Sequence, residues 1–483
     1  MVLTAEVVFF VFFCPDHTKL GHNGVPEGDF RKSILEAIQW EIMTTRIINL
    51  WNKIRSSLWF IPTLMTASVM VLAFLTFFVD QYSALGQWFS DQRFAIGPQG
   101  ARTLLATVAG SVIGVAGVSF SITIVALTLA SSQFGPRLLN NFMKDLTNQM
   151  ILGTFIATFI YCLLVLGSIR ENKGEVFVPQ ISILVGILLT LMSLGVFIYF
   201  IHHISISIHA EKVITAVSKD LKKTINHLFP QKRGQGKTEG GPASESTIPP
   251  NFEREAQLVL SPASGYLQAI DQQGIMDLAI GQDLLIHLKH RPGAFIVAGE
   301  VLASVWPPQN IEDAHLKKIA HTFLIGSQRT EEQDVEFSIH LLVELAVRAL
   351  SPGINDPFSA IGCIDRLGEC LSLLAGRTLP SPYCYDDTHQ LRVIINPITM
   401  EGIFNAAFNQ IRQNGGACVA VGLRLLETFG VLVSTTDNPT VYEAVRHHAK
   451  MVKEEMLRHL KEGGDLQEVE TRYRDIQKLL PIK

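Results

Sequence analysis

Four long apolar stretches without a charged residue constrain this chain more than any other feature. They cover residues 58–79, 103–130, 150–168 and 178–201. A helix needs roughly 20 apolar residues, rising about 1.5 Å each, to cross the hydrocarbon core of a bilayer. Each stretch has about that length or more. Only 17% of the whole chain is charged, below the roughly 25% of an average soluble protein. The sequence therefore predicts four transmembrane helices.

The distribution of basic residues indicates how the spans are oriented, because cytoplasmic loops carry an excess of lysine and arginine. Arg46, Lys53 and Arg55 precede the first span, and Arg137 and Lys144 lie between the second and the third. A lysine-rich stretch follows the fourth span. The two remaining loops also carry basic residues, but acidic residues offset them. We therefore expect both termini to be cytoplasmic.

Residues 1–45 are predicted to form an irregular N-terminal extension. The apolar run at its start is too short to cross a bilayer, and it lacks the basic start and cleavage site of a signal peptide. A start assigned upstream of the natural one is an alternative explanation. Residues 46–229 hold the four spans and then a cytoplasmic helical extension with apolar residues at intervals of 3 and 4. Residues 230–250, rich in Gly, Ser and Pro, predict a flexible linker.

Residues 251–308 are predicted to form a small β module. Short runs of β-type residues at 256–260, 284–288 and 294–298 are separated by Gly and Pro turns. Residues 309–483 are predicted to form a helical cytoplasmic domain, because helical periodicity replaces these short runs. The predicted fold class is thus an α-helical integral membrane protein with four transmembrane helices and a C-terminal soluble α+β region.

The first long helix of the helical domain is expected to follow residue 330. Thr330 and Gln333 fit a capping box, in which each side chain bonds the backbone of the other residue. Residues 390–395 are a strand candidate between later helices. The expected core face of the first helix consists of Val335, Ile339, Leu342, Leu345 and Ala349.

The stretch RALSPGINDPFSAIG, residues 348–362, interrupts a helical pattern and restarts it at once. Asp356 is suited to be the N-cap of the second helix, and Pro357 suits the first helical position, where no amide hydrogen is needed. The motif is therefore either helix punctuation or a loop in which Asn355 and Asp356 bind a ligand or partner. Both roles can coexist. No base or nucleophile lies nearby in the sequence to make the loop catalytic.

Small residues recur along one side of the second span. Their spacing of 3, 4 or 7 keeps them on one helix face. Such a face either lets helices pack closely or lines a polar path in an oligomer. A proton relay or charge-coupled pump is disfavoured because no span contains a charge. The candidate residues are Gly110, Gly114, Gly117, Ser121 and Thr128.

Several functions have no support in the sequence. The net charge of −4 and the lack of a long Lys/Arg block give no reason to expect nucleic acid as a partner. There is no phosphate-binding loop, hydrolase elbow, zinc-protease motif or dinucleotide fingerprint, so we expect neither an enzyme nor a cofactor. His202 and His203 follow the fourth span, but adjacent residues of a helix point in different directions, so we expect no metal site.

Four stretches of the chain resemble a known family. Residues 131–166 (SSQFGPRLLNNFMKDLTNQMILGTFIATFIYCLLVL) and 348–361 (RALSPGINDPFSAI) are similar to the two strongest signatures of the bacterial predicted-membrane-protein family called domain of unknown function twenty-two fifty-four. Residues 56–62 and 291–302 fit it as well, and the similarity covers roughly residues 46 to 460. The resemblance implies a four-span inner-membrane protein with a cytoplasmic C-terminal domain. It implies no reaction, substrate or cofactor.

Two functional hypotheses follow. The first is an oligomeric inner-membrane pore or channel-like transporter for ions or small solutes, in which the lipid bilayer and further copies of the chain are the partners and the cytoplasmic domain is the gate. The second is a membrane-anchored sensor or scaffold whose cytoplasmic domain binds a small molecule, an ion or a protein. The sequence identifies neither the transported species nor the ligand.

Overall fold

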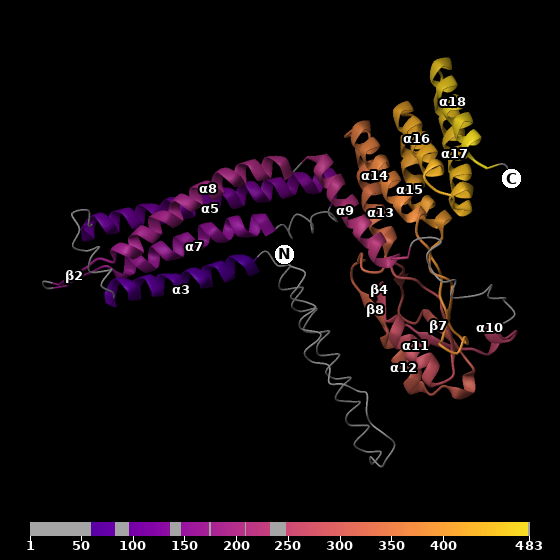
Figure 1. Ribbon diagram of the computed structural model, residues 1–483, viewed down its shortest axis with the longest axis horizontal. Helices are drawn as coiled ribbons and strands as arrows, with labels where there is room; N and C mark the ends of the chain where they lie inside the picture. Colours follow the sequence, from indigo (N-terminus) through magenta and orange to yellow (C-terminus); the bar gives the residue numbers. More distant parts are fainter. Residues whose placement is uncertain are drawn as a thin grey trace, which may run out of the picture.

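A computed structural model describes residues 59–82, 96–135, 146–172, 175–207, 209–231 and 248–481. The expected N-terminal extension and most of the expected linker lie outside these residues. The described chain forms an elongated helical bundle and, beside it, a region of helices and small sheets (Figure 1).

Four helices of the bundle are long and apolar enough to cross a membrane, which confirms the four predicted spans. Helix α5 has 37 residues and is therefore about 55 Å long, well beyond the roughly 30 Å of a bilayer core. A short hairpin of β1 (Arg170–Asn172) and β2 (Glu175–Phe177) joins the last two helices. The four helices are α3 (Phe60–Tyr82), α5 (Pro98–Phe134), α7 (Leu146–Ser168) and α8 (Gln180–Ser207).

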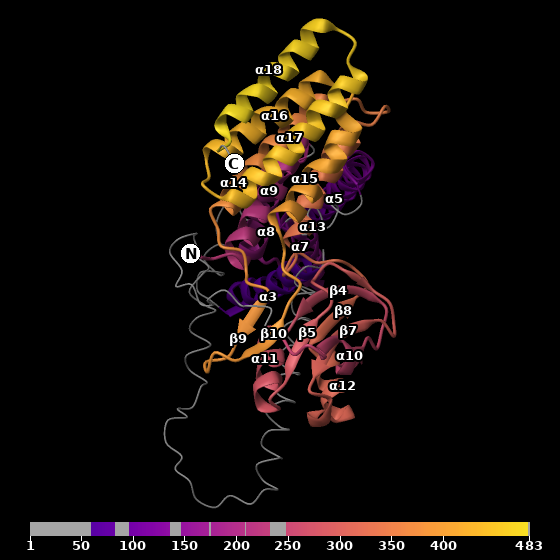
Figure 2. The same cartoon turned by 90° about the vertical axis from the view of Figure 1, so that its right-hand side faces the viewer.

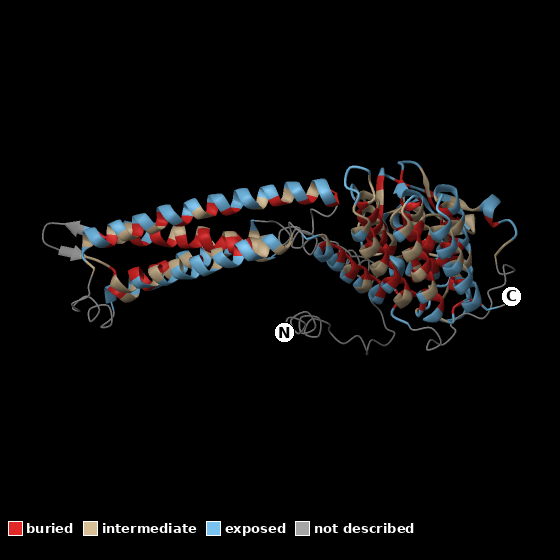
Figure 3. Ribbon diagram, turned by 90° about the horizontal axis from the view of Figure 1, so that it is seen from above, coloured by how far each residue is buried: buried red, intermediate tan, exposed pale blue. Residues whose placement is uncertain are grey.

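Helix α7 lies at the centre of the bundle. Half of its most apolar segment is buried, against 17% for α3 and 22% for α5 and α8, and its buried residues follow its length in Figure 3. The Tyr161 hydroxyl donates to the Ser182 carbonyl of α8 at 3.0 Å and lies 3.0 Å from Thr76 Oγ1 of α3. These contacts join three helices around one polar atom that would otherwise be buried without a partner.

Helix α9 (Ala210–Leu228) follows α8 and leaves the bundle. Its apolar face, which includes Val217, Leu221 and Ile225, is buried against helices α13 (Val335–Ala349) and α14 (Pro357–Ala375). The expected amphipathic extension is thus an integral part of the helical region, and it connects that region to the last membrane helix.

The helical region has one apolar core that includes α9 and six helices of the C-terminal half. All five residues expected on the core face of α13 are buried. Ala130 and Phe134 of α5 join the same core. Besides α13 and α14, the core holds α15 (Met400–Gly415), α16 (Val419–Ser434), α17 (Pro439–His459) and α18 (Gly463–Leu479).

Two small sheets lie below these helices in the view of Figure 2. The five-stranded sheet has the order β3 (Gln257–Leu260), β7 (Val301–Trp306), β5 (Leu285–Leu288), β10 (Leu391–Ile394), β9 (Tyr383–Tyr385). The three-stranded sheet has the order β6 (Phe295–Ile296), β4 (Gly265–Ile270), β8 (Phe323–Gly326). Strand β10 pairs in parallel with β5, so the sheets use strands from both sides of residue 308. Helices α10 (Phe252–Glu255), α11 (Gln272–Gly281) and α12 (Asp313–His321) and the short η3 (Pro308–Asn310) accompany them.

The expected capping box of Thr330 and Gln333 is wrong. Helix α13 begins at Val335, and Asp334 caps it by accepting from the Phe337 amide at 3.2 Å. A carboxylate held by the Arg329 guanidinium outcompetes the threonine hydroxyl for this role. The Gln333 carboxamide instead accepts from the Ile270 amide and donates to the Ile270 carbonyl, at 3.0 and 3.2 Å, which ties the helix start to β4.

Candidate functional site

The loop between α13 and α14 contains the predicted candidates Asn355 and Asp356. Asp356 is the N-cap of α14, accepts from the Ser359 amide at 3.1 Å, and is followed by Pro357 in the first turn, as predicted. Asn355 has a φ of 51°, in the left-handed region that asparagine adopts more readily than most residues. Both residues therefore have a structural role, while a ligand-binding role for this loop stays a prediction.

The chemistry of the loop favours contact over catalysis. Hydrogen bonds from Ser359 lower the pKa of the Asp356 carboxyl, so it is ionised at neutral pH and is a poor proton acceptor. Next to it, Ile354 is 46% and Phe358 is 82% exposed. Both apolar side chains are accessible to a partner, and neither brings a reactive group to the loop.

The predicted small-residue face points away from the other helices of the bundle. Gly110, Gly114 and Gly117 are exposed, and a Cβ at any of them would meet nothing within 4 Å. Ser121 and Thr128 are exposed on the same helix. The opposite side of α5 carries its buried residues, of which Ala130 and Phe134 pack in the helical region; the others are Ala101, Leu105, Ala109, Val112, Ala116, Ser119 and Ala126. Packing within one described chain therefore does not account for the small face.

The two motif stretches meet where α5 ends. Gly135 closes α5 with a φ of 99°, and a Cβ there would lie 2.5 Å from Glu344 Oε1 and 3.1 Å from Arg348 Nε. Arg348 Nε lies 3.4 Å from Glu344 Oε1. Arg348 opens the RALSPGINDP motif, and Gly135 belongs to SSQFGPR. A membrane helix and the motif loop are thus joined through a position that only glycine fits.

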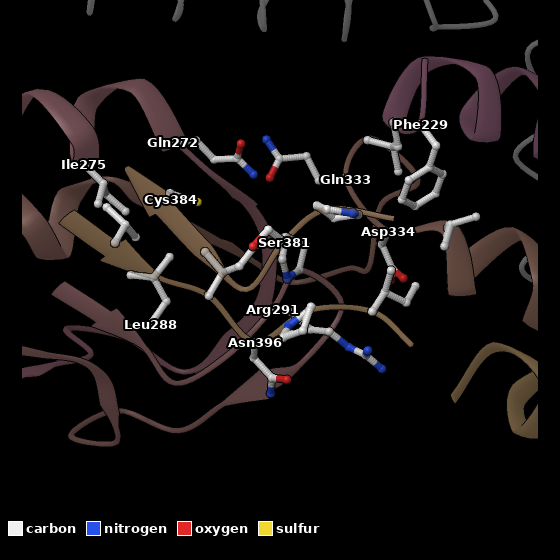
Figure 4. Close-up of a pocket in the computed structure, with 18 of the residues that line it drawn as sticks. Phe229, Gln272, Ile275, Leu288, Arg291, Gln333, Asp334, Ser381, Cys384 and Asn396 are labelled. Atoms are coloured by element: carbon white, nitrogen blue, oxygen red, sulfur yellow. The ribbon is translucent and has the colours of Figure 1, made fainter. Parts of the chain in front are cut away.

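A cavity of about 660 Å³ lies between the sheets and the helical region. It is lined by the end of α9, the start of α11, the turn after β5, the start of α13 and the segments that flank β9 and β10. Figure 4 shows Gln272 and Gln333 pointing toward one another on one side, with Arg291 and Asn396 on the other. Its volume is within the range of small-molecule sites.

The charged groups at the cavity are paired with one another. Arg291 Nη2 lies 2.7 Å from Glu336 Oε1, and Arg329 pairs with Asp334. Burial raises the pKa of the Glu336 carboxyl, which the charge of Arg291 opposes. Burial also raises the pKa of the Cys384 thiol, so this cysteine is protonated and unreactive at neutral pH. The cavity is therefore suited to binding rather than to nucleophilic chemistry.

Sequence reasoning missed this cavity. Its lining comes from segments more than 150 residues apart, between Phe229 and Ile398. Arg291 stood out only as the first residue of a stretch that fits the family, and Gln333 only as a capping candidate. Elsewhere, no three His, Cys, Asp or Glu side chains of the described ranges come together to hold a metal ion.

Comparisons with known proteins agree with the membrane character of the chain. The family model described as "Predicted membrane protein (DUF2254)" matches residues 55–430. Uncharacterized proteins of Mycobacterium bovis and Mycobacterium tuberculosis are 29% identical over 374 residues, covering 76% of this chain and 70% of theirs. No solved structure matches the chain.

Proposed function

The chain belongs to the DUF2254 family of predicted membrane proteins, and on that premise we propose that it forms an oligomeric pore for ions or small solutes, gated by its cytoplasmic region. The course of α5 is the observation that carries this proposal. One continuous helix presents a small-residue face outward and then ends inside the core of the helical region. The proposed activity is transport without catalysis.

Assembly of several copies gives the small face a role. Glycines let helix backbones approach closely, which is the main source of helix association in lipid. Ser121 Oγ donates to the Gly117 carbonyl and Thr128 Oγ1 to the Ile124 carbonyl, each at 2.9 Å. Their hydrogens are thus satisfied within the helix, while their oxygens remain acceptors for a passing solute. A face of this kind is stable in lipid and still polar enough to line a path.

The pore must form between copies because the middle of one bundle is filled. Tyr161 and Leu105 are fully buried, and Phe155 is 1% exposed. A Cβ at Gly186 would already touch Leu105 and the Tyr161 ring at 3.5 Å. Interiors packed in this way leave no room for a solute.

Two helices would transmit a gating movement. The end of α5 is buried in the core shared by α9 and α13, and α9 follows directly from the membrane helix α8. A shift of the helical region therefore displaces both α5 and α8, because packed helices move as rigid bodies. We place this region, with both termini, in the cytoplasm and the spans in the bacterial inner membrane, as the basic residues favour.

Subunit counting tests the assembly that the proposal requires. A fluorescently tagged chain would be counted by stepwise photobleaching in native membrane vesicles, without detergent. We expect one dominant class of spots with more than one step each. A population of single steps in these vesicles would contradict the pore, because one chain has a filled centre.

A membrane-anchored sensor or scaffold is the second candidate, and the cavity beside α9 favours it. In that case the spans only hold the cytoplasmic region at the bilayer. Polar substitutions on the small face of α5 should then leave its activity intact. Loss of partner binding on Asn355→Ala, with solute flux unchanged, would favour this candidate over the pore.

A further inference from the structure

We propose that the cavity between the sheets and the helical region binds an uncharged heterocyclic small molecule of the nucleobase type. Neither the family description nor the relatives assign a ligand to this chain. The binding claim goes beyond the pore proposal and stands without it, because it rests on the cavity alone.

The lining provides an apolar surface for a flat ring. Met276 of α11, Ile395 beyond β10 and Ile398 before α15 line the cavity and are only partly buried, so each offers apolar surface to a ligand. A cavity of about 660 Å³ is large enough for a base with its sugar. Burying one face of a heterocycle against such side chains is favourable without any charge.

The balance of charge argues against an anionic ligand. Arg291 is paired with Glu336 at 2.7 Å, and Arg329 is paired with Asp334. Arg291, Asp334 and Glu336 line the cavity together with His227, whereas Arg329 lies outside the lining. Arg291 is therefore the one arginine or lysine of the lining, and two carboxylates balance it, which leaves no excess of guanidinium or ammonium charge for a phosphate or carboxylate. The helix starts at the cavity are also already capped by the carboxylates of Asp271 and Asp334. An anion would have to displace one of these groups.

The polar groups that remain unused are those that recognise a base edge. Gln272 and Asn396 line the cavity, and neither side chain bonds another residue in the described parts of the chain. The Gln333 carboxamide, by contrast, already bonds the amide and the carbonyl of Ile270. A carboxamide places a donor beside an acceptor, which matches the N–H and C=O or ring-nitrogen edge of a base. Ser381, between Gln272 and Asn396 in Figure 4, adds a hydroxyl whose oxygen accepts from the Tyr383 amide at 3.1 Å and which can still donate its hydrogen to a ligand.

The position of the cavity gives such a ligand a structural effect. Leu228 and Phe229, at the end of α9, line it together with residues of the sheets. A bound molecule would therefore contact both the sheet region and the helix that continues from α8. Occupancy would stabilise the relative placement of these parts.

Calorimetric titration of the full chain in lipid nanodiscs tests the proposal, with adenosine, guanosine, cytidine and uridine as probes. We expect at least one nucleoside to bind with one site per chain. Gln272→Ala and Asn396→Ala should each weaken it by about fivefold or more, since each removes one hydrogen-bonding group. Gln282→Ala, an exposed glutamine at the far end of α11 and outside the cavity, is the matched control and should bind like the parent.

Three results would overturn the proposal. The first is no binding of any nucleoside up to the millimolar range. The second is binding that both cavity variants leave unchanged. The third is binding of a nucleoside 5′-monophosphate about tenfold tighter than its nucleoside and lost in Arg291→Ala, which would assign the cavity to an anion instead. Thermal unfolding of each variant without ligand shows whether it is folded. None of these readouts depends on solute flux.

Discussion

Asp356 holds the turn between α13 and α14 through contacts to its own neighbours. Its carboxylate accepts from the Ser359 amide and from Ser359 Oγ, at 3.1 and 2.5 Å. The bonds satisfy one of the free amides at the start of α14. A local arrangement of this kind depends only on the residues Asp-Pro-Phe-Ser, so it is readable from the sequence.

Replacing Asp356 with alanine should destabilise the helical region by about 1 kcal/mol, the usual cost of losing an N-cap. Asp356→Asn keeps an acceptor and should cost less. Because the pKa of Asp356 is lowered in the folded state, its contribution is present above about pH 4 and is lost as the pH falls below that value. Thermal unfolding of parent and variants between neutral pH and pH 3 measures both effects. Equal stability of parent and Asp356→Ala would contradict the capping role.

His448 is a buried histidine whose two ring nitrogens have no hydrogen-bond partner among the residues that the structure describes. It lies on α17 against Phe404, Phe408 and Phe429. Burial lowers its pKa most, and together with the neighbouring charges of His447 and Arg412 it brings the pKa to about 4. Between this pKa and its higher pKa in the unfolded chain, His448 is protonated when the chain is unfolded but neutral in the folded core.

Acid should accordingly destabilise the helical region through His448. The pKa of His448 is near 6.5 in the unfolded chain. The free energy of unfolding therefore falls as the pH drops from about 6.5 to about 4, with a slope of up to about 1.4 kcal/mol per pH unit. His448→Phe should remove this part of the pH dependence and preserve stability at pH 7. The exposed His321→Phe is the control. Parallel pH profiles of unfolding for His448→Phe and the parent would contradict this prediction.

At the scale of elements, the end of α5 joins the membrane helices to the helical region. Gly135→Ala would place a methyl group against Glu344, in a backbone conformation that alanine resists. We expect faster amide hydrogen exchange in the last turns of α5 and α13. Gly299→Ala is the matched control, because Gly299 also has a positive φ, of 86°, but open space around it. Unchanged exchange at both helix ends in Gly135→Ala would show that the joint is not tight.

A second link between elements is the cap that α3 provides for α8. The Asp80 carboxylate accepts from the Ile181 amide, the Ser182 amide and Ser182 Oγ, at 2.9, 2.9 and 2.6 Å. Asp80→Ala should lower the thermal stability of the chain in detergent by about 1–3 kcal/mol, since it leaves these donors without an acceptor. The thermal stability of Asp80→Asn should lie between that of the parent and that of Asp80→Ala. A stability equal to that of the parent would contradict a capping role.

At the scale of the whole molecule, the parts that follow from local pattern were predictable. The four spans could be predicted from their length and their lack of charged residues, and the cap at Asp356 could be predicted from the residues next to it. The capping box at Thr330 failed because Asp334 caps α13 and the distant Ile270 backbone takes the Gln333 carboxamide.

The long-range parts were not predictable from one sequence. Helix α5 runs past its apolar stretch to Phe134 because α9 and α13 bury its end. Strand β10 joins β5 across more than 100 residues, and the cavity exists only once these segments meet. No local pattern specifies a pairing at that separation. The direction of the small face, away from its own bundle, likewise emerges only from packing.

Solute flux is the measurement that tests the pore most directly. Liposomes containing the purified chain would be challenged with ion gradients, voltage and osmotic shock, beside Gly117→Leu and Gly195→Leu. Both glycines are exposed on membrane helices with nothing within 4 Å of a Cβ, but only Gly117 lies on the small face of α5. We predict flux in the parent and in Gly195→Leu, and a reduction of about tenfold or more in a folded and assembled Gly117→Leu. No flux in the parent under any challenge, or equal flux in both variants, would contradict a pore along α5.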